Sequence, residues 1–262
     1  MILTLDIGNS NIVFGVYHKE KLLFTARVKT DVLRTEWEYA VLIRDILKLN
    51  SCHADSLTGS IISSVVPPLS AILSDAVSIV KSGIPVLQIG PGIKTGLNIK
   101  IDNPSQLGAD MVATAVGAMT KYPLPAVIID LGTATKITVV DCDRNYLGGS
   151  IMPGVMISLD ALSNRAAQLP HISLTDEVTV IGTNTIDAMK SGVILGTAGM
   201  VDGMIERYRE KVGKEASVVA CGGLVGAIIP HCRANIITDH YLLLDGLRFL
   251  YEKNVPSAPV TD

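Results

Sequence analysis

An internal repeat constrains the fold of this chain more than any other feature of its sequence. The segment DIGNSNIVFGV begins at Asp6, and DLGTATKITVV begins at Asp130, 124 residues later. In both copies an apolar run ends on an aspartate, a short turn with glycine and small polar residues follows, and a second apolar run begins. A repeat at this domain-sized spacing indicates two duplicated domains and not a solenoid of short units.

The segments that follow each repeat predict alternating strands and helices. In the first half, residues 21–30 are a predicted strand, residues 59–68 contain a short buried strand, and residues 34–50 place apolar side chains at helical spacing. In the second half, a long helix over about 185–210 precedes a strand within residues 216–223. Adjacent hairpin strands combined with crossover helices predict mixed sheets with helices on both faces. The predicted fold class is α/β, with domains at residues 1–121 and 122–262.

The composition favours a globular chain with a large core and disfavours several classes of partner. Hydrophobic residues make up 48% of the chain and charged residues 18%, which is not typical of disorder. The net charge of −3 argues against binding to nucleic acid or to a membrane surface, because such proteins usually carry a basic face. No signal peptide is predicted, since Asp6 interrupts the first apolar run. The apolar run between Lys190 and Asp202 is too short to span a bilayer, so we expect a cytoplasmic protein.

Each repeated turn has the features of a phosphate-binding loop. Successive backbone N–H groups in a tight turn form an anion-binding concavity, and Ser, Thr or Asn side chains add donors. Glycine lets the backbone approach a phosphate without a Cβ in the way. Two such loops on duplicated domains facing a common cleft would clamp a polyphosphate. Carboxylates repel phosphate, so Asp6 is predicted to hold Mg²⁺ through water, and Asp130 to hold a second cation or to orient its own loop.

Alternative explanations exist for these loops. Asp6 and Asp130 could each cap the following turn through an Asx-type bond, although that explains two matching copies less well than one. The other common nucleotide motifs, GxxxxGK[ST] and a full GxGxxG, do not occur in the sequence. The segment CGGLVGA at residues 221–227 follows a predicted strand and could form a backbone wall for an adenine.

Asp110 is the candidate catalytic carboxylate. Phosphoryl transfer to an alcohol requires a group that orients the hydroxyl and accepts its proton. Apolar residues recur at helical spacing after Asp110, which places it at the start of a helix, and Gly108 and Ala109 leave room for a substrate. The alternative role for Asp110 is structural, as a first-turn residue that interacts favourably with the helix dipole.

The long predicted helix carries glycines on one face, at positions 192, 196, 199 and 203. Glycine inside a helix costs about 1 kcal/mol relative to alanine, so four on one face indicate close approach by another helix. A dimer contact is the favoured explanation, and packing inside the same chain is the alternative.

Seven ordered motifs resemble those of type III pantothenate kinases: DIGNSN, SSVVPP, NPSQLGAD, DLGTAT, GGSIMPG, GTNTIDAMKSG and ACGG. The resemblance covers nearly the whole chain. It implies the acetate-and-sugar-kinase, heat-shock-70 and actin superfold, in which two duplicated ribonuclease-H-like (actin-like) α/β domains flank a nucleotide cleft. It also implies ATP-dependent phosphorylation of pantothenate to 4'-phosphopantothenate, the first step of coenzyme A biosynthesis. The implied enzyme is a homodimer that needs a monovalent cation, K⁺ or NH₄⁺.

The resemblance further implies roles for the residues that match the family motifs. Thr133 would contact ATP from the second loop, and Asp130 would ligate the monovalent cation. The first ATP loop would consist of Asp6, Ile7, Gly8, Asn9, Ser10, Asn11, Ile12 and Val13. The pantothenate site, with Asp110 as proton acceptor, would consist of Ile101, Gly108, Ala109, Asp110, Met111 and Thr185.

Four positions on the acceptor side depart from the family pattern. Met111 stands where an arginine is usual, Ile101 replaces a tyrosine, Thr114 an asparagine and Lys190 a glutamine. Arginine makes directional charge-assisted bonds that methionine cannot imitate, and such a loss weakens binding by roughly 10- to 150-fold. Two alternatives therefore stay open: a paralogous small-molecule kinase with a different acceptor, or a catalytically weak nucleotide-binding paralogue.

Overall fold

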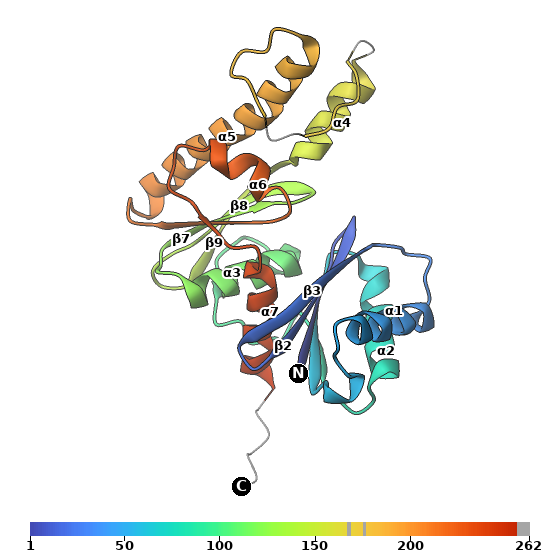
Figure 1. The fold of residues 1–262 in the computed structure, drawn as a ribbon. Coiled ribbons are helices and arrows are strands. Elements are labelled where there is room, and N and C mark those ends of the chain that lie inside the picture. Colours follow the sequence, from blue (N-terminus) through green and yellow to red (C-terminus); the bar gives the residue numbers. More distant parts are fainter. Residues whose placement is uncertain (167–168, 175–176, 256–262) are drawn as a thin grey trace. The chain divides into compact units, whose positions relative to one another are not determined.

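The computed structural model describes residues 1–166, 169–174 and 177–255 and shows two compact units (Figure 1). The chain crosses between the units four times, so the last described helix belongs with the N-terminal strands. The predicted division into domains 1–121 and 122–262 stays a prediction. The final residues of the predicted second domain, 256–262, lie outside the described part of the chain. The first unit comprises residues 1–96, 103–120 and 242–255, and the second comprises residues 97–102 and 121–241, within the described ranges.

The first unit contains a five-stranded mixed sheet in the order β3-β2-β1-β4-β5. Strand β1 pairs antiparallel with β2 and parallel with β4. The predicted opening hairpin and the two strands that follow it are confirmed, whereas the short strand β5 was not predicted. The strands are β1 (Ile2–Ile7), β2 (Asn11–His18), β3 (Lys21–Lys29), β4 (Gly59–Ser64) and β5 (Val86–Gln88).

Helices cover both faces of the first sheet. Helices α1 (Glu36–Leu49) and α2 (Pro67–Val80) pack on the face that carries Leu3 and Leu5, where the buried core of this unit forms. Helix α7 (Leu242–Asn254) contacts β1 and β4 on the other face. There the hydroxyl of Tyr251 donates a hydrogen bond to the carbonyl oxygen of Thr58 at 3.2 Å.

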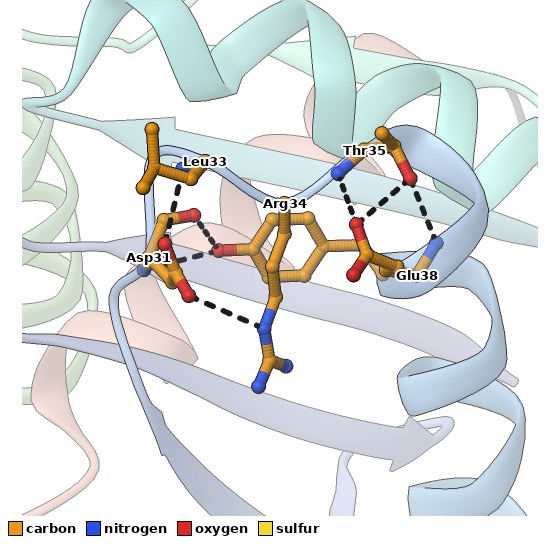
Figure 2. A network of polar contacts seen from close by, with 6 residues as sticks. Asp31, Leu33, Arg34, Thr35 and Glu38 are labelled. Atoms are coloured by element: carbon orange, nitrogen blue, oxygen red, sulfur yellow. Dashed lines mark hydrogen bonds and ion pairs between the residues drawn. The ribbon is translucent and has the colours of Figure 1, made fainter.

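The start of α1 is fixed by a local network of polar contacts (Figure 2). The side chain of Thr35 accepts the backbone N–H of Glu38, and the carboxylate of Glu38 accepts the N–H of Thr35. This capping box satisfies N–H groups that the first helical turn leaves without backbone partners. Just before it, the guanidinium of Arg34 lies 3.6 Å from the carboxylate of Asp31. The helix predicted for residues 34–50 is therefore confirmed, with a defined beginning.

Helix α3 (Ala109–Lys121) packs closely against α7 through two glycines. A Cβ at Gly117 would overlap the carbonyl oxygen of Leu242, and a Cβ at Gly246 would overlap that of Ala113. Both positions therefore require glycine for the two helix backbones to approach each other. This contact holds α3, which has Asp110 in its first turn, against α7 on one face of the first sheet.

The second unit contains a six-stranded sheet in the order β11-β10-β7-β8-β9-β6. Strand β7 pairs antiparallel with β8 and parallel with β10, as β1 does with β2 and β4. The five strands β7 to β11 thus repeat the order of β1 to β5, which confirms the predicted duplication, and β6 adds an edge. The strands are β6 (Asn98–Ile99), β7 (Ala126–Leu131), β8 (Ala134–Val140), β9 (Asn145–Pro153), β10 (Ser217–Cys221) and β11 (Ile237–Thr238).

Among its described residues, the second unit has three α-helices: α4 (Val155–Arg165), α5 (Thr185–Val212) and α6 (Val225–Ile228). They share a buried core with alternate residues of β7, such as Val127 and Ile129. The long helix predicted over about 185–210 is confirmed. Among the described residues, no helix combines the length and the apolar character that crossing a membrane requires.

The glycine stripe lies on the outer side of α5. Gly192, Gly196 and Gly199 are exposed. Apart from adjacent residues and the nearby backbone of the same helix, a Cβ at any of them would meet no described atom within 4 Å. A Cβ at Gly203 would lie 3.1 Å from the side chain of Arg207 on the same helix. Close packing inside the described chain therefore does not account for the stripe.

Asp239 connects the two ends of residues 121–241, the longer segment of the second unit. Its side chain is only 8% exposed, and its Oδ2 lies 2.6 Å from Nζ of Lys121 and accepts a hydrogen bond from the hydroxyl of Tyr122 at 2.7 Å. Its Oδ1 accepts the N–H of Tyr241 at 3.1 Å. Burial raises the pKa of Asp239, but the bonds from Lys121 and Tyr122 outweigh it, so the pKa is lowered from its ordinary value.

A lowered pKa makes Asp239 a source of acid sensitivity. Its stabilising contribution is present above the unfolded-state pKa of 3.8 and is lost as the pH falls through the lower folded-state pKa. We predict that Asp239→Asn lowers the free energy of unfolding by about 1–3 kcal/mol at pH 7 and that stability then falls less steeply below pH 4 than in the wild type. Urea denaturation at pH 7 and below pH 4 measures both effects. The exposed Asp160→Asn serves as control, and equal acid sensitivity of Asp239→Asn and wild type would contradict the prediction.

Candidate active site

The predicted site residues divide between the two units. Asp6 with its loop and residues 108–111 belong to the first unit, whereas Ile101, Asp130, Thr133 and Thr185 belong to the second. Asp6 and Asp110 therefore share one compact unit, although several strands and helices separate them along the chain.

Asp6 lies near the end of β1, opposite Ser63 in the parallel ladder with β4. The hydroxyl of Ser63, which is fully buried, donates a hydrogen bond to Oδ1 of Asp6 at 3.0 Å. The neighbouring strand thus orients the carboxylate. Ser63 belongs to the SSVVPP motif, to which no role had been assigned, and the parallel register that brings it beside Asp6 has no local signal in the sequence.

Hydrogen bonds from Thr30 fix the turn after β1. Thr30 donates its hydroxyl to the carbonyl oxygen of Gly8 at 2.6 Å and its N–H to that of Ser10 at 3.1 Å. The N–H of Gly8 donates to the carbonyl oxygen of Asn11 at 3.0 Å. With these carbonyl groups occupied, the exposed side chains of Asn9, Ser10 and Asn11 form the polar outer edge of a fixed turn.

Asp110 is the second residue of α3, as predicted, and it bonds to its own helix. Its Oδ1 accepts the N–H of Met111 at 2.8 Å. A Cβ at position 108 would lie 2.5 Å from this same oxygen, so Gly108 leaves the space that the carboxylate occupies. The hydroxyl of Thr114 donates to the carbonyl oxygens of Asp110 and Met111, at 3.0 and 3.2 Å. The side chain of Thr114 is therefore engaged with the helix backbone.

Asp130 lies near the end of β7 and is directly opposite Lys136 on β8. The Nζ atom of Lys136 lies 2.7 Å from Oδ2 of Asp130, and the two side chains are 16% and 18% exposed. On the other side of the carboxylate, a Cβ at Gly132 would lie 3.3 Å from Oδ1 and a Cβ at Gly222 would lie 2.8 Å from it. The carboxylate thus contacts a lysine amine and lies beside two glycines of neighbouring loops.

Gly222 joins the ACGG segment to the Asp130 loop. Its φ of +102° is one that residues with side chains rarely adopt, and a Cβ there would lie 2.6 Å from the carbonyl oxygen of Leu131. The same carbonyl oxygen accepts the N–H of Leu224 at 3.2 Å. The turn after β10 therefore depends on glycine to pack against the end of β7.

The remaining predicted residues lie on other elements of the second unit. Thr133 is exposed in the turn between β7 and β8, and a Cβ at Gly154 would overlap its carbonyl oxygen, so this turn packs against the start of α4. Ile101 lies near β9, 3.4 Å from the position a Cβ would take at Gly148. Thr185 is the first residue of α5, after the helix-capping side chain of Asn184.

Gly222 offers a test of this packing. We predict that Gly222→Ala lowers the free energy of unfolding by about 1–3 kcal/mol, because the substitution combines an unfavourable φ with contacts to Leu131 and Asp130. Gly226→Ala is the matched control, since a Cβ there would meet no described atom within 4 Å. Urea denaturation measures both variants. Equal stability of the two variants would contradict the close packing described here.

Comparison with known proteins identifies closely similar chains. Residues 2–207 match the family model for type III pantothenate kinase. A protein from Exiguobacterium sibiricum that is named type III pantothenate kinase is 44% identical over 254 residues, which cover 97% of this chain and 100% of that protein.

Solved structures share the fold at low sequence identity. A candidate Baf family transcriptional activator from Campylobacter jejuni gives a TM-score of 0.62 at 19% identity, over 96% of this chain and 98% of that one. A candidate 2-dehydro-3-deoxygalactonokinase from Sinorhizobium meliloti gives a TM-score of 0.59 at 12% identity, over 98% and 100%. These likenesses concern the fold alone and agree with the predicted α/β class.

Proposed function

Because this chain belongs to the type III pantothenate kinase family, we propose that it transfers the terminal phosphoryl group of ATP to pantothenate. The products are ADP and 4'-phosphopantothenate, and the reaction is the first step of coenzyme A biosynthesis. The observation that carries this proposal is the family match over residues 2–207, together with 44% identity to a full-length relative of that name.

ATP binding is assigned to residues 6–13 in the first unit and to Thr133 in the second. The support is the braced turn after β1, whose exposed polar side chains follow an oriented carboxylate. Mg²⁺ is commonly held by one or two carboxylates together with substrate phosphates and water. Asp6, fixed by Ser63, fits this pattern, and the ion would neutralise charge on the phosphates during transfer. The structure's described residues form no cluster of three or more acidic, His or Cys ligands, and a magnesium–ATP site needs none.

Asp110 is assigned the role of proton acceptor for the attacking hydroxyl of pantothenate. Its position at the start of α3, in the same unit as Asp6, supports this role. The bond from the N–H of Met111 to Oδ1 helps to orient the carboxylate. The pantothenate site is proposed to include Ile101, residues 108–111 and Thr185.

Asp110→Asn tests the proposed chemistry. We predict that this variant loses pantothenate-dependent ADP release by about 10²- to 10⁴-fold, the usual contribution of a general base. Its affinity for a non-hydrolysable ATP analogue should stay within about twofold by calorimetry, because the carboxylate is assigned to the acceptor. Asp75→Asn, an exposed aspartate of α2, is the control. Unchanged turnover in Asp110→Asn would remove this residue from the mechanism.

The same assay tests the acceptor. Met111→Arg restores the usual charged side chain of the family, so a large gain in pantothenate turnover would identify a redirected acceptor site. Wild-type protein that binds ATP but does not turn over pantothenate would contradict pantothenate as the substrate.

We also propose that the enzyme is a cytoplasmic homodimer that associates through α5. The glycine stripe supports this, because its outer side has no packing partner among the described residues and each glycine costs helix stability. Helix α4, which packs beside α5, exposes apolar side chains as well: Met156, Ile157 and Leu162 are between 41% and 45% exposed. A second copy would cover this surface.

A bulky side chain in the stripe should prevent association. We predict that Gly196→Trp elutes as a monomer, while the wild type is a dimer by light scattering after size-exclusion chromatography. Lys211→Trp is the control, because this exposed residue lies eight positions after Gly203, about 80° around the helix. A dimeric Gly196→Trp variant would place the interface elsewhere.

A further inference from the structure

The carboxylate expected to bind a monovalent cation already carries a positively charged partner. Nζ of Lys136 lies 2.7 Å from Oδ2 of Asp130. We propose that the ammonium group of Lys136 supplies the positive charge at Asp130 in place of K⁺ or NH₄⁺, so that this enzyme functions without either cation. The inference rests on the proposed kinase function and concerns the second ATP loop.

The hairpin backbone fixes this pair. Asp130 and Lys136 are directly opposite in the antiparallel ladder of β7 and β8, so both side chains project from the same face of the sheet. The next pair towards the turn is Leu131 with Thr135, and both of these residues are fully buried. A shift of the ladder by one residue would turn these buried side chains to the opposite face. The register therefore holds Lys136 beside Asp130.

The chemistry of the pair matches that of the cation it would replace. A lysine side chain ends in a primary ammonium group with three N–H donors, which is an ammonium ion with one carbon substituent. A separation of 2.7 Å is typical of a charge-assisted bond from such a group to a carboxylate. Both side chains are more than four-fifths buried, so water screens the interaction less than at the surface.

The positive charge already beside Asp130 disfavours a further cation there. Oδ2 of Asp130 lies 2.7 Å from Nζ of Lys136, and both side chains are less than 20% exposed. A second positive charge at the same carboxylate would be repelled by Lys136. The lysine belongs to the strand that directly follows the turn of Thr133, so its charge is part of the proposed ATP loop itself.

The test compares cation dependence in wild type and in variants of Lys136. Protein is prepared in Tris and choline chloride, and KCl or NH₄Cl is then added at constant ionic strength. We expect pantothenate-dependent ADP release by the wild type to change less than twofold. Lys136→Met removes the charge, and we expect it to lose roughly 10- to 150-fold without K⁺ and to regain activity when K⁺ or NH₄⁺ is added. Lys136→Arg should remain independent of both, and Lys211→Met is the control for loss of a distant lysine.

A second readout separates this inference from the proposed function. Affinity for a non-hydrolysable ATP analogue and the thermal midpoint are measured with the same cations and without pantothenate. A wild type that is insensitive to K⁺ and NH₄⁺ and a Lys136→Met variant that both cations stabilise would support the inference, even if pantothenate is not the acceptor. A wild type that needs either cation to bind the analogue would overturn it, whether or not the variants fold.

Discussion

The structure depends on one recurring constraint: a partly buried carboxylate at the residue before the last of a strand. A buried charge is costly unless hydrogen bonds or an opposite charge compensate it. In each half of this protein a neighbouring strand provides such a partner. For Asp6 it is the hydroxyl of Ser63 on the parallel strand β4, and for Asp130 it is the amine of Lys136 on the antiparallel strand β8. Both carboxylates are therefore compensated, but the compensating side chain comes from the strand on one side of Asp6 and from the strand on the other side of Asp130.

A difference of one residue in turn length explains why the two carboxylates have different residues opposite them in their hairpins. In the first hairpin the residue opposite Asp6 is Val13, and in the second the residue opposite Asp130 is Lys136. A gapless alignment of the two repeats would instead match Lys136 with Ile12. The first turn is one residue longer. Lys136 therefore lies on the same face of its sheet as Asp130, whereas the aligned residue Ile12 lies on the opposite face from Asp6. A one-residue change of register is enough to replace an apolar neighbour by a charged one.

These partners give the two loops different electrostatic properties. A serine hydroxyl orients Asp6 without adding a positive charge, which suits a carboxylate that is proposed to face Mg²⁺. Lys136 instead balances the charge of Asp130 within the protein. Because the backbone of each hairpin is retained while the partner changes, the duplicated fold supports two loops with different functions. The family match over residues 2–207 includes both loops, and this difference distinguishes them.

The sequence by itself determined the elements whose signal is local. Apolar runs, glycine turns and helical periodicity predicted both hairpins, the long helix α5 and the duplicated α/β fold, because these patterns act on neighbouring residues. The same patterns placed Asp110 at the start of α3. Strands of two or three residues, such as β5, β6 and β11, escaped prediction because they are too short to show a period.

Tertiary structure alone decided which side chains meet. The contacts of Asp6 with Ser63 and of Asp130 with Lys136 depend on strand register. The placement of α7 in the first unit depends on packing against α3 at Gly117 and Gly246. Register and helix packing are set by many contacts between residues far apart in the chain, so a single segment does not carry this information.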